Sequence, residues 1–269
     1  MFFTLRAFIN ESFGIPNPPL TEKNLPDQTG KVHLITGANT GVGYQVASIL
    51  YSKNAKVYIA ARSEAKAQAA IESIKALHPT SKGSLHYLHL NLSDLSTIKE
   101  SANDFLSRED KLHWLNNNAG VMTPPVGSKG AQGMDLTFQT NILGPFLFSK
   151  LLQPLLKRTA ESEPVKGSVR VSWAGSLGVV VIAPTGGVKW RKGKDGQDEL
   201  DETGGPDLSY GISKCANYFL GNEFARRFAA DGVLHNVSSP CPSSCLGYAS
   251  VRGCSHPTYF LIDRYADNL

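Results

Sequence analysis

The chain has 269 residues, of which 41% are hydrophobic, enough to bury the core of one globular domain. Its 27 basic and 23 acidic residues give a net charge of +4 and are spread along the chain. This even distribution argues against a nucleic-acid or anionic-membrane surface. The four cysteines, clustered toward the end of the chain, are too few for a disulfide framework. We therefore expect a reducing, cytoplasmic location.

Residues 1–30 are expected to form an N-terminal arm ahead of the domain. The opening stretch MFFTLRAFINESF is apolar but carries Arg6 and Glu11, so it is too short and too charged for a signal peptide or a membrane span. We expect the arm to pack on the domain. The alternative is an interfacial helix whose apolar side chains contact a membrane.

Beyond the arm, short apolar runs alternate with longer amphipathic ones, as in parallel strands joined by helices. Strands are predicted at residues 31–36, 56–60, 84–92, 111–117, 168–173 and 233–238. Helices are predicted at residues 42–53, 64–77 (with Ser63 as N-cap), up to about 106, 134–157 and from about 209. We predict an α/β fold: a doubly wound, Rossmann-like parallel sheet in a single domain, residues 31–240, with its ligand crevice at the carboxyl ends of the strands.

A glycine-rich turn, TGANTGVG, directly follows the first predicted strand. Glycines allow a tight turn and let a pyrophosphate approach the backbone, while the next helix offers unpaired N–H groups at its N-terminus. Its place between a strand and a helix indicates a dinucleotide site. The glycines concerned are Gly37, Gly41 and Gly43.

The end of the second predicted strand is where a carboxylate would bind the ribose hydroxyls of NAD(H) and repel a 2′-phosphate. This chain has Ala60, Ala61 and Arg62 there, without a carboxylate. Arg62 has the charge and the hydrogen-bond donors that suit a 2′-phosphate. We therefore predict NADP(H) as the cofactor. The alternative for Arg62 is a solvated loop arginine.

Tyr210 and Lys214 lie four residues apart in the stretch SYGISKCANYFL, and so on one face of a helix. Protonating an alkoxide after hydride transfer requires a positioned acid. A tyrosine has a pKa near ~10, so it needs a neighbouring cation to act as a base near neutral pH. Standing alone, such a spacing is explained by a surface pair on a helix; together with the glycine turn, Asn141 and Ser176, the pair is predicted to be catalytic.

Five motifs occur in a fixed order: TGANTGVG, NNAG at residues 117–120, an isolated Asn141, Ser176 and Tyr210-x-x-x-Lys214. Together they resemble the short-chain dehydrogenase/reductase family, over about residues 13–240. The stretches LTEKNLPDQTGKV, NAKVYIAARS and NNAGVM are similar to fungal members of secondary-metabolite pathways and to retinol dehydrogenase-like reductases. Ser176 fits the family better than Ser172, which falls inside a predicted strand.

The resemblance implies an NADP(H)-dependent oxidoreductase that interconverts a carbonyl and a secondary alcohol on a small or medium apolar metabolite. In it Asn141 would hold a water of the proton relay, Ser176 would orient the substrate carbonyl and Tyr210 would exchange the proton. Lys214 would bind the nicotinamide ribose. Further cofactor contacts are implied for Asn39, Thr40, Val42, Asn91 (where the family has an aspartate), Asn118, Ala119 and Gly120.

An insert at residues 177–208 is expected near the active site. Its residues 179–184 and Trp190 are candidates for an apolar substrate pocket, although Trp190 is equally well explained as a packing anchor.

The tail at residues 241–269 departs from the family, because Pro240 is followed by Cys241 rather than by the usual glycine. The tail is either divergent or the result of a truncated or misread frame. The rival function is therefore a catalytically impaired protein that binds nucleotide without turnover. No metal site is predicted, since the cysteine and histidine spacing fits no zinc pattern. Association into a homo-oligomer stays open.

Overall fold

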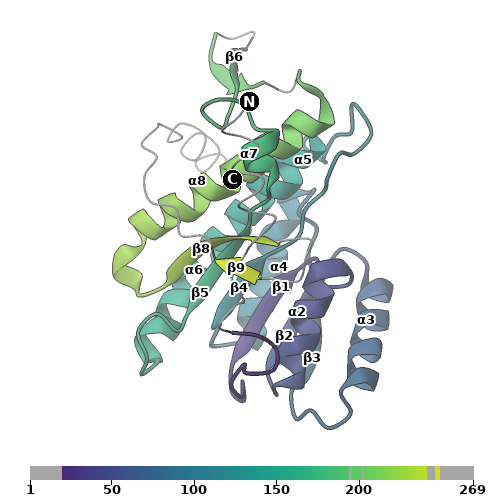
Figure 1. The fold of residues 1–269 in the computed structure, drawn as a ribbon, viewed down its shortest axis with the longest axis vertical. Coiled ribbons are helices and arrows are strands. Elements are labelled where there is room, and N and C mark those ends of the chain that lie inside the picture. The colour runs from purple at the N-terminus through teal and green to yellow at the C-terminus, as the bar shows by residue number, and fades with distance from the viewer. Residues whose placement is uncertain (1–19, 194–195, 202, 241–245, 249–269) are drawn as a thin grey trace.

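The computed structural model describes residues 20–193, 196–201, 203–240 and 246–248. A seven-stranded sheet with the order β3-β2-β1-β4-β5-β8-β9 forms its centre (Figure 1). The six parallel strands are β1 (Val32–Thr36), β2 (Lys56–Ala61), β3 (Ser84–His89), β4 (Trp114–Asn117), β5 (Arg170–Ala174) and β8 (Leu234–Pro240). The strand β9 (Leu246–Tyr248) runs antiparallel to β8.

Helices cover both faces of the sheet because both faces are apolar. Along β1, Leu34 points to one face and Ile35 to the other, as the alternation of a strand requires. The face of Ile35 packs against α2 (Gly41–Ser52) and α3 (Glu64–Leu77). The face of Leu34 packs against α4 (Leu95–Arg108), α6 (Gly144–Ser162) and α8 (Gly205–Arg227). The predicted doubly wound α/β fold is therefore confirmed.

Most predicted elements are found close to their expected limits. The helix α3 has the predicted bounds, and the Ser63 hydroxyl accepts a hydrogen bond from the Lys66 N–H at 3.4 Å, as an N-cap should. The third strand ends at His89, three residues early, and the fourth begins only at Trp114. The strand β9 was not predicted, because three residues are too few to show a period.

Two predicted helices differ from the observed ones. The helix predicted at 134–157 is divided into α5 (Leu136–Phe138), a π-helical turn η1 (Gln139–Leu143) and α6. Pro145 explains the break, because it has no N–H to donate to the carbonyl of Asn141 four residues earlier. The helix α8 begins at Gly205 rather than near residue 209, since Pro206 suits the first turn of a helix.

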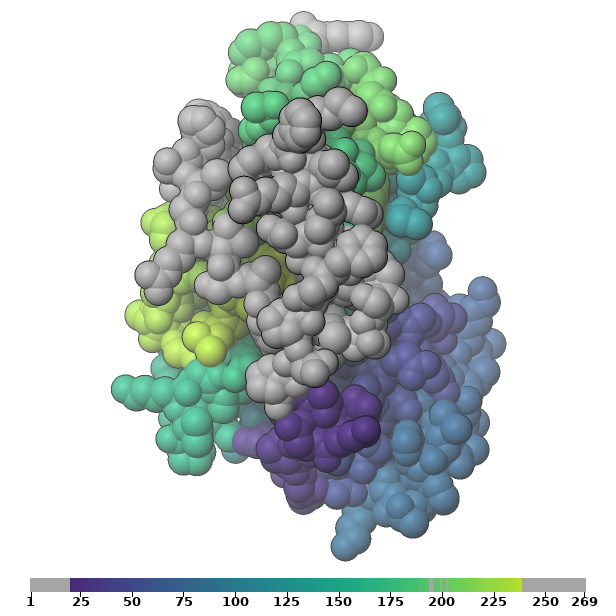
Figure 2. Space-filling model, viewed as in Figure 1, coloured from purple at the N-terminus to yellow at the C-terminus, as the bar shows by residue number. Residues whose placement is uncertain are grey.

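The insert contains the short helix α7 (Gly178–Val181) and a hairpin of β6 (Trp190–Lys192) and β7 (Asp198–Leu200). In the space-filling view, the green insert lies at the opposite end of the molecule from the purple and blue first part of the domain (Figure 2). Trp190, at the start of β6, is 37% exposed. Most of the predicted arm and tail lie outside the described residues. Within the described residues, no helix is long and apolar enough to cross a membrane.

A buried carboxylate holds the end of α6 against the amino ends of β1 and β4. Glu163 accepts hydrogen bonds from Lys31, from Lys111 at 3.2 Å and from His113 Nε2 at 3.2 Å. His113 Nδ1 accepts from the N–H of Val32 at 2.9 Å, so the imidazole proton sits on Nε2. These donors, chiefly Lys31, lower the pKa of Glu163 from 4.5 to about 2.

Replacing Glu163 with glutamine is expected to lower the melting temperature at pH 7 by roughly 4–8 °C, because a buried charged acceptor is lost. Since the folded pKa is about 2 and the ordinary value 4.5, this stabilisation is complete above pH 4.5 and is lost as the pH falls through 2. Thermal melts across this range test the expectation, with the exposed Glu72→Gln as control. A difference that stayed constant from pH 7 down to pH 3 would contradict it.

Candidate functional site

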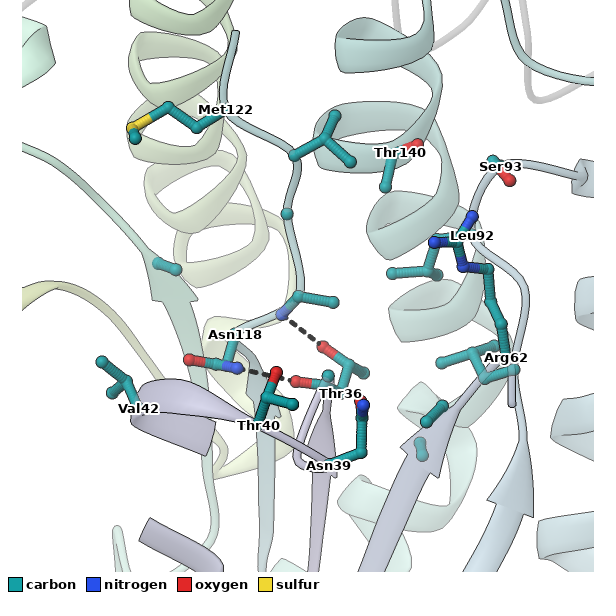
Figure 3. A pocket seen from close by; sticks show the side chains of 18 of the residues that line it. Thr36, Asn39, Thr40, Val42, Arg62, Leu92, Ser93, Asn118, Met122 and Thr140 are labelled. Carbon is teal, nitrogen blue, oxygen red and sulfur yellow. Dashed lines mark hydrogen bonds between the residues drawn. The ribbon is translucent and has the colours of Figure 1, made fainter. Parts of the chain in front are cut away.

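A cavity of about 480 Å³ lies where the carboxyl ends of β1, β2, β4 and β5 meet (Figure 3). Parallel strands bring these ends to one edge, with Thr36 opposite Ala60 and Asn117 opposite Trp173. The described residues that line the cavity are Thr36, Gly37, Asn39, Thr40, Val42, Ala60, Ala61, Arg62, Leu90, Leu92, Ser93, Asn118, Ala119, Gly120, Val121, Met122, Thr140, Ala174, Gly175, Tyr210 and Lys214.

The charged side chains that line the cavity are all cationic. Arg62 and Lys214 contribute cations, and none of these lining residues is an aspartate or a glutamate. Arg62 directly follows β2, and its side chain extends toward Leu92 and Ser93 (Figure 3). Its guanidinium has no hydrogen-bond partner within the described part of the chain. The cavity therefore offers a positive potential to an anionic ligand.

The glycine turn allows the loop after β4 to approach closely. Gly37 has a φ of +68°, and a Cβ there would lie 3.0 Å from Cα of Ala119. A Cβ on Gly43 would lie 2.6 Å from Nδ2 of Asn118 and 2.8 Å from the Gly37 carbonyl oxygen. Gly43 and Gly41 are outside the lining and act by shaping it, whereas the predicted contacts Asn39, Thr40 and Val42 line the cavity.

The loop after β4 is tied to the end of β1. Nδ2 of Asn118 donates to the Thr36 carbonyl oxygen at 2.9 Å, and the N–H of Ala119 donates to the Thr36 hydroxyl at 2.9 Å (Figure 3). These bonds hold residues 118–120 along the cavity wall, where they were predicted. Sequence reasoning missed Thr36, although its place as the last residue of a strand was a usable signal.

Asn91 is outside the lining. Its Oδ1 accepts hydrogen bonds from the Ser93 hydroxyl at 2.7 Å and from the Ser93 N–H at 3.3 Å. The carbonyl of its amide therefore closes the turn after β3. The neighbours Leu90, Leu92 and Ser93, which were not predicted, line the cavity in its place.

Lys214 is brought against Tyr210 and β5. Its ammonium is 5.5 Å from the centre of the Tyr210 ring and donates to the Ala174 carbonyl oxygen at 3.2 Å. Nδ2 of Asn217 donates to the same oxygen at 3.0 Å. Only 5% of Lys214 is exposed, and this burial lowers its pKa from 10.5 to about 8. Two members of the predicted set are thus neighbours on the wall of the cavity.

Ser176 lies beside Tyr210, across Gly178. A Cβ on Gly178 would lie 3.3 Å from Oγ of Ser176 and 3.4 Å from Cε1 of Tyr210. Oγ of Ser176 accepts a hydrogen bond from the Gly178 N–H at 3.0 Å. Ser172, the other serine of this segment, lies inside β5 as expected, with its hydroxyl between Trp114 and Asn236.

Asn141 is fully buried in η1 and does not line the cavity. Its Oδ1 accepts from the Val121 N–H at 2.8 Å, and its Nδ2 donates to the Val121 carbonyl at 2.9 Å and to the Ser213 hydroxyl at 3.0 Å. The side chain therefore joins η1, the loop after β4 and α8. The main-chain carbonyl of Asn141 lacks its α-helical donor, because residue 145 is a proline.

Replacing Gly43 with alanine is expected to lower stability by about 1–3 kcal/mol and to weaken nucleotide binding, since the methyl group crowds Asn118 and the Gly37 carbonyl. Thermal melts and nucleotide titrations measure both effects. If the contact with Asn118 is the cause, the loss is smaller in an Asn118→Ala background. Equal losses in the two backgrounds would contradict the assignment.

Several known proteins are similar to this chain in sequence. A family model described as short chain dehydrogenase matches residues 31–173. A short-chain dehydrogenase/reductase of Phomopsis amygdali is 50% identical over 225 residues, covering 83% of this chain and 65% of the relative. The short-chain dehydrogenase/reductase pkfC of Emericella nidulans is 44% identical over 220 residues, covering 82% of this chain and 68% of the relative.

Among solved structures, that of an uncharacterized protein from Mycobacterium paratuberculosis has a TM-score of 0.63 at 27% identity and covers 84% of this chain and 74% of that one. The chain spans about two thirds of the length of the two fungal relatives. From the match to the family model and the identity to these relatives, the chain belongs to the short-chain dehydrogenase/reductase family.

Proposed function

We propose that the protein is an NADP(H)-dependent oxidoreductase that interconverts a carbonyl and a secondary alcohol on a small or medium apolar metabolite. The observation that carries this proposal is the pair of Tyr210 and Lys214 on the wall of a cation-lined cavity. The resemblance of its sequence to fungal members of secondary-metabolite pathways suggests a step in such a pathway as its setting. We further propose that residues 31–240 form the catalytic domain, with 177–208 as its insert.

The cavity suits a dinucleotide in shape and in charge. Because Gly37 and Gly43 have no Cβ, the glycine turn lies close to Asn118 and Ala119 in the loop after β4. The turn leads into the N-terminus of α2, which can bind a phosphate. Arg62 and Lys214 face the cavity without a carboxylate among its lining residues. Arg62 would bind the 2′-phosphate, and Lys214 the nicotinamide ribose. A bound nicotinamide would supply or accept the hydride.

In this proposal Tyr210 exchanges the proton with the substrate oxygen. The nearby ammonium of Lys214 stabilises the phenolate form, and with a pKa of about 8 most of it is charged at neutral pH. The Tyr210 hydroxyl has no protein hydrogen-bond partner in the described part of the chain, so it is free to meet a substrate oxygen. The Ser176 oxygen already accepts from the Gly178 N–H, which leaves the Ser176 proton for the same substrate oxygen.

The proton would be passed on through a water at the Asn141 main-chain carbonyl, since both amide protons of the side chain and one acceptor site of its oxygen are already used. Apolar side chains near the site favour an apolar substrate. Met122, on the cavity wall, is 68% exposed, and Val181 and Ile182 are exposed in and after α7. A nucleotide binder without turnover has less support, because Tyr210, Lys214 and Ser176 lie together.

Replacing Tyr210 with phenylalanine is expected to lower turnover by roughly 10²–10⁴-fold while NADPH binding changes little, because only the proton donor is removed. Loss of NADPH absorbance with a panel of apolar ketones measures turnover, and NADPH fluorescence measures binding. Tyr218→Phe, two turns along the same helix, is the control. Wild-type rates in Tyr210→Phe would refute the assignment.

Replacing Arg62 with alanine is expected to raise the Kd of NADPH by roughly 10–100-fold, because a charged hydrogen bond to the 2′-phosphate is lost. The Kd of NADH, which lacks this phosphate, stays within about twofold. Fluorescence titrations with both nucleotides measure the two constants, and Arg158→Ala, exposed on α6, is the control. Equal losses for NADPH and NADH would mean that Arg62 does not read the phosphate.

A further inference from the structure

The insert lies close against α8 at Gly211, next to Tyr210. A Cβ on Gly211 would lie 3.0 Å from the main-chain nitrogen of Ala183 and 3.0 Å from Cγ2 of Ile182. Two of the three nearest atoms belong to the backbone, since the main-chain carbon of Ile182 follows at 3.1 Å. A change of rotamer cannot relieve the contacts with the backbone, so a methyl group at this position requires the end of α7 to move by a few tenths of an ångström.

Gly187, farther along the insert, packs against the same face of α8. Gly211, Cys215 and Phe219 are spaced four residues apart and so lie on one stripe of the helix. A Cβ on Gly187 would lie 3.0 Å from Cε2 of Phe219 and 3.3 Å from Cβ of Cys215. Residues 182–187 therefore run along this stripe, while Tyr210 and Lys214 occupy the stripe beside it, which faces the cavity.

The contact at Gly211 is linked to Ser176 through one turn of backbone. The N–H groups of Ile182 and Ala183 both donate to the Gly178 carbonyl at 3.0 Å. The N–H of Gly178 in turn donates to Oγ of Ser176 at 3.0 Å. A displacement of residues 182–183 away from α8 is thus carried to Ser176. Tyr210 stays in place, because α8 is bonded to β5 through Lys214 and Asn217.

We propose that Gly211 is a positioning residue that sets how closely α7 approaches α8, and thereby the spacing of the Ser176 and Tyr210 hydroxyls. This inference rests on the proposed function, in which both hydroxyls act on one substrate oxygen. Gly178 completes the arrangement, because its missing Cβ leaves Ser176 and Tyr210 in contact distance of the same point. The insert is then part of the catalytic geometry.

The test is Gly211→Ala, with Gly221→Ala as a matched control. Gly221 lies in the same helix, and a Cβ there would crowd Val237 at 2.8 Å and Trp173 at 3.2 Å, away from Ser176. We expect Gly211→Ala to lower kcat at least about tenfold, because misplacement by a fraction of an ångström is costly in this geometry. The Kd of NADPH stays within about twofold. Gly221→Ala lowers the melting temperature without this loss of kcat.

A double-mutant cycle with Ser176→Ala separates positioning from general damage. If Gly211 acts through Ser176, the loss of kcat caused by Gly211→Ala largely disappears in the Ser176→Ala background. A wild-type kcat in Gly211→Ala, or the same fold-loss in both backgrounds, would overturn the proposal.

A second measurement does not depend on turnover. Amide hydrogen exchange of residues 178–183 is expected to accelerate in Gly211→Ala and to stay unchanged in Gly221→Ala. If the wild type reduces no carbonyl in the panel, the proposed function fails, and the exchange experiment alone then decides this inference. Unchanged exchange at residues 178–183 in Gly211→Ala would overturn it.

Discussion

The burial of one ammonium group governs the site. Lys214 is nearly inaccessible to solvent, and within the described part of the chain its ammonium makes a single hydrogen bond, to the Ala174 carbonyl, and lies near the Tyr210 ring. Removing a cation from water is unfavourable unless negative charge is near, which is why its pKa falls to about 8. An anionic cofactor or a phenolate at Tyr210 relieves this cost. The cavity therefore favours the binding of a negatively charged group beside Lys214.

The same lysine determines how α8 lies on the sheet. Lys214 and Asn217 share the Ala174 carbonyl at the end of β5, so the rotation of the helix is fixed beside Tyr210. With this rotation, one stripe of α8 faces the cavity and the neighbouring stripe faces the insert. Two glycines, which have no side chain, allow other segments to approach closely. Gly43 admits Asn118 at the turn, and Gly211 admits the end of α7.

Much of the fold follows from local patterns. The helix α3 and its cap at Ser63 were predicted to the residue, because the apolar period and the capping serine are both short-range signals. The break at η1 was missed although Gly144 and Pro145 were visible, since the apolar period continues through it. In the site, Tyr210 and Lys214 were found because a spacing of four is a property of any helix.

The sequence by itself determined the alternation of strands and helices, the glycine turn and the Tyr210–Lys214 pair, since each depends on residues within a few positions of one another. Only the tertiary structure decided which distant groups meet. The Asn141 amide reaches Ser213, 72 residues on, and Thr36 reaches Asn118, 82 residues on. Such contacts depend on the order of strands and on the packing of helices across the sheet, which no local pattern encodes. Through such contacts the Asn141 side chain joins η1, the loop after β4 and α8.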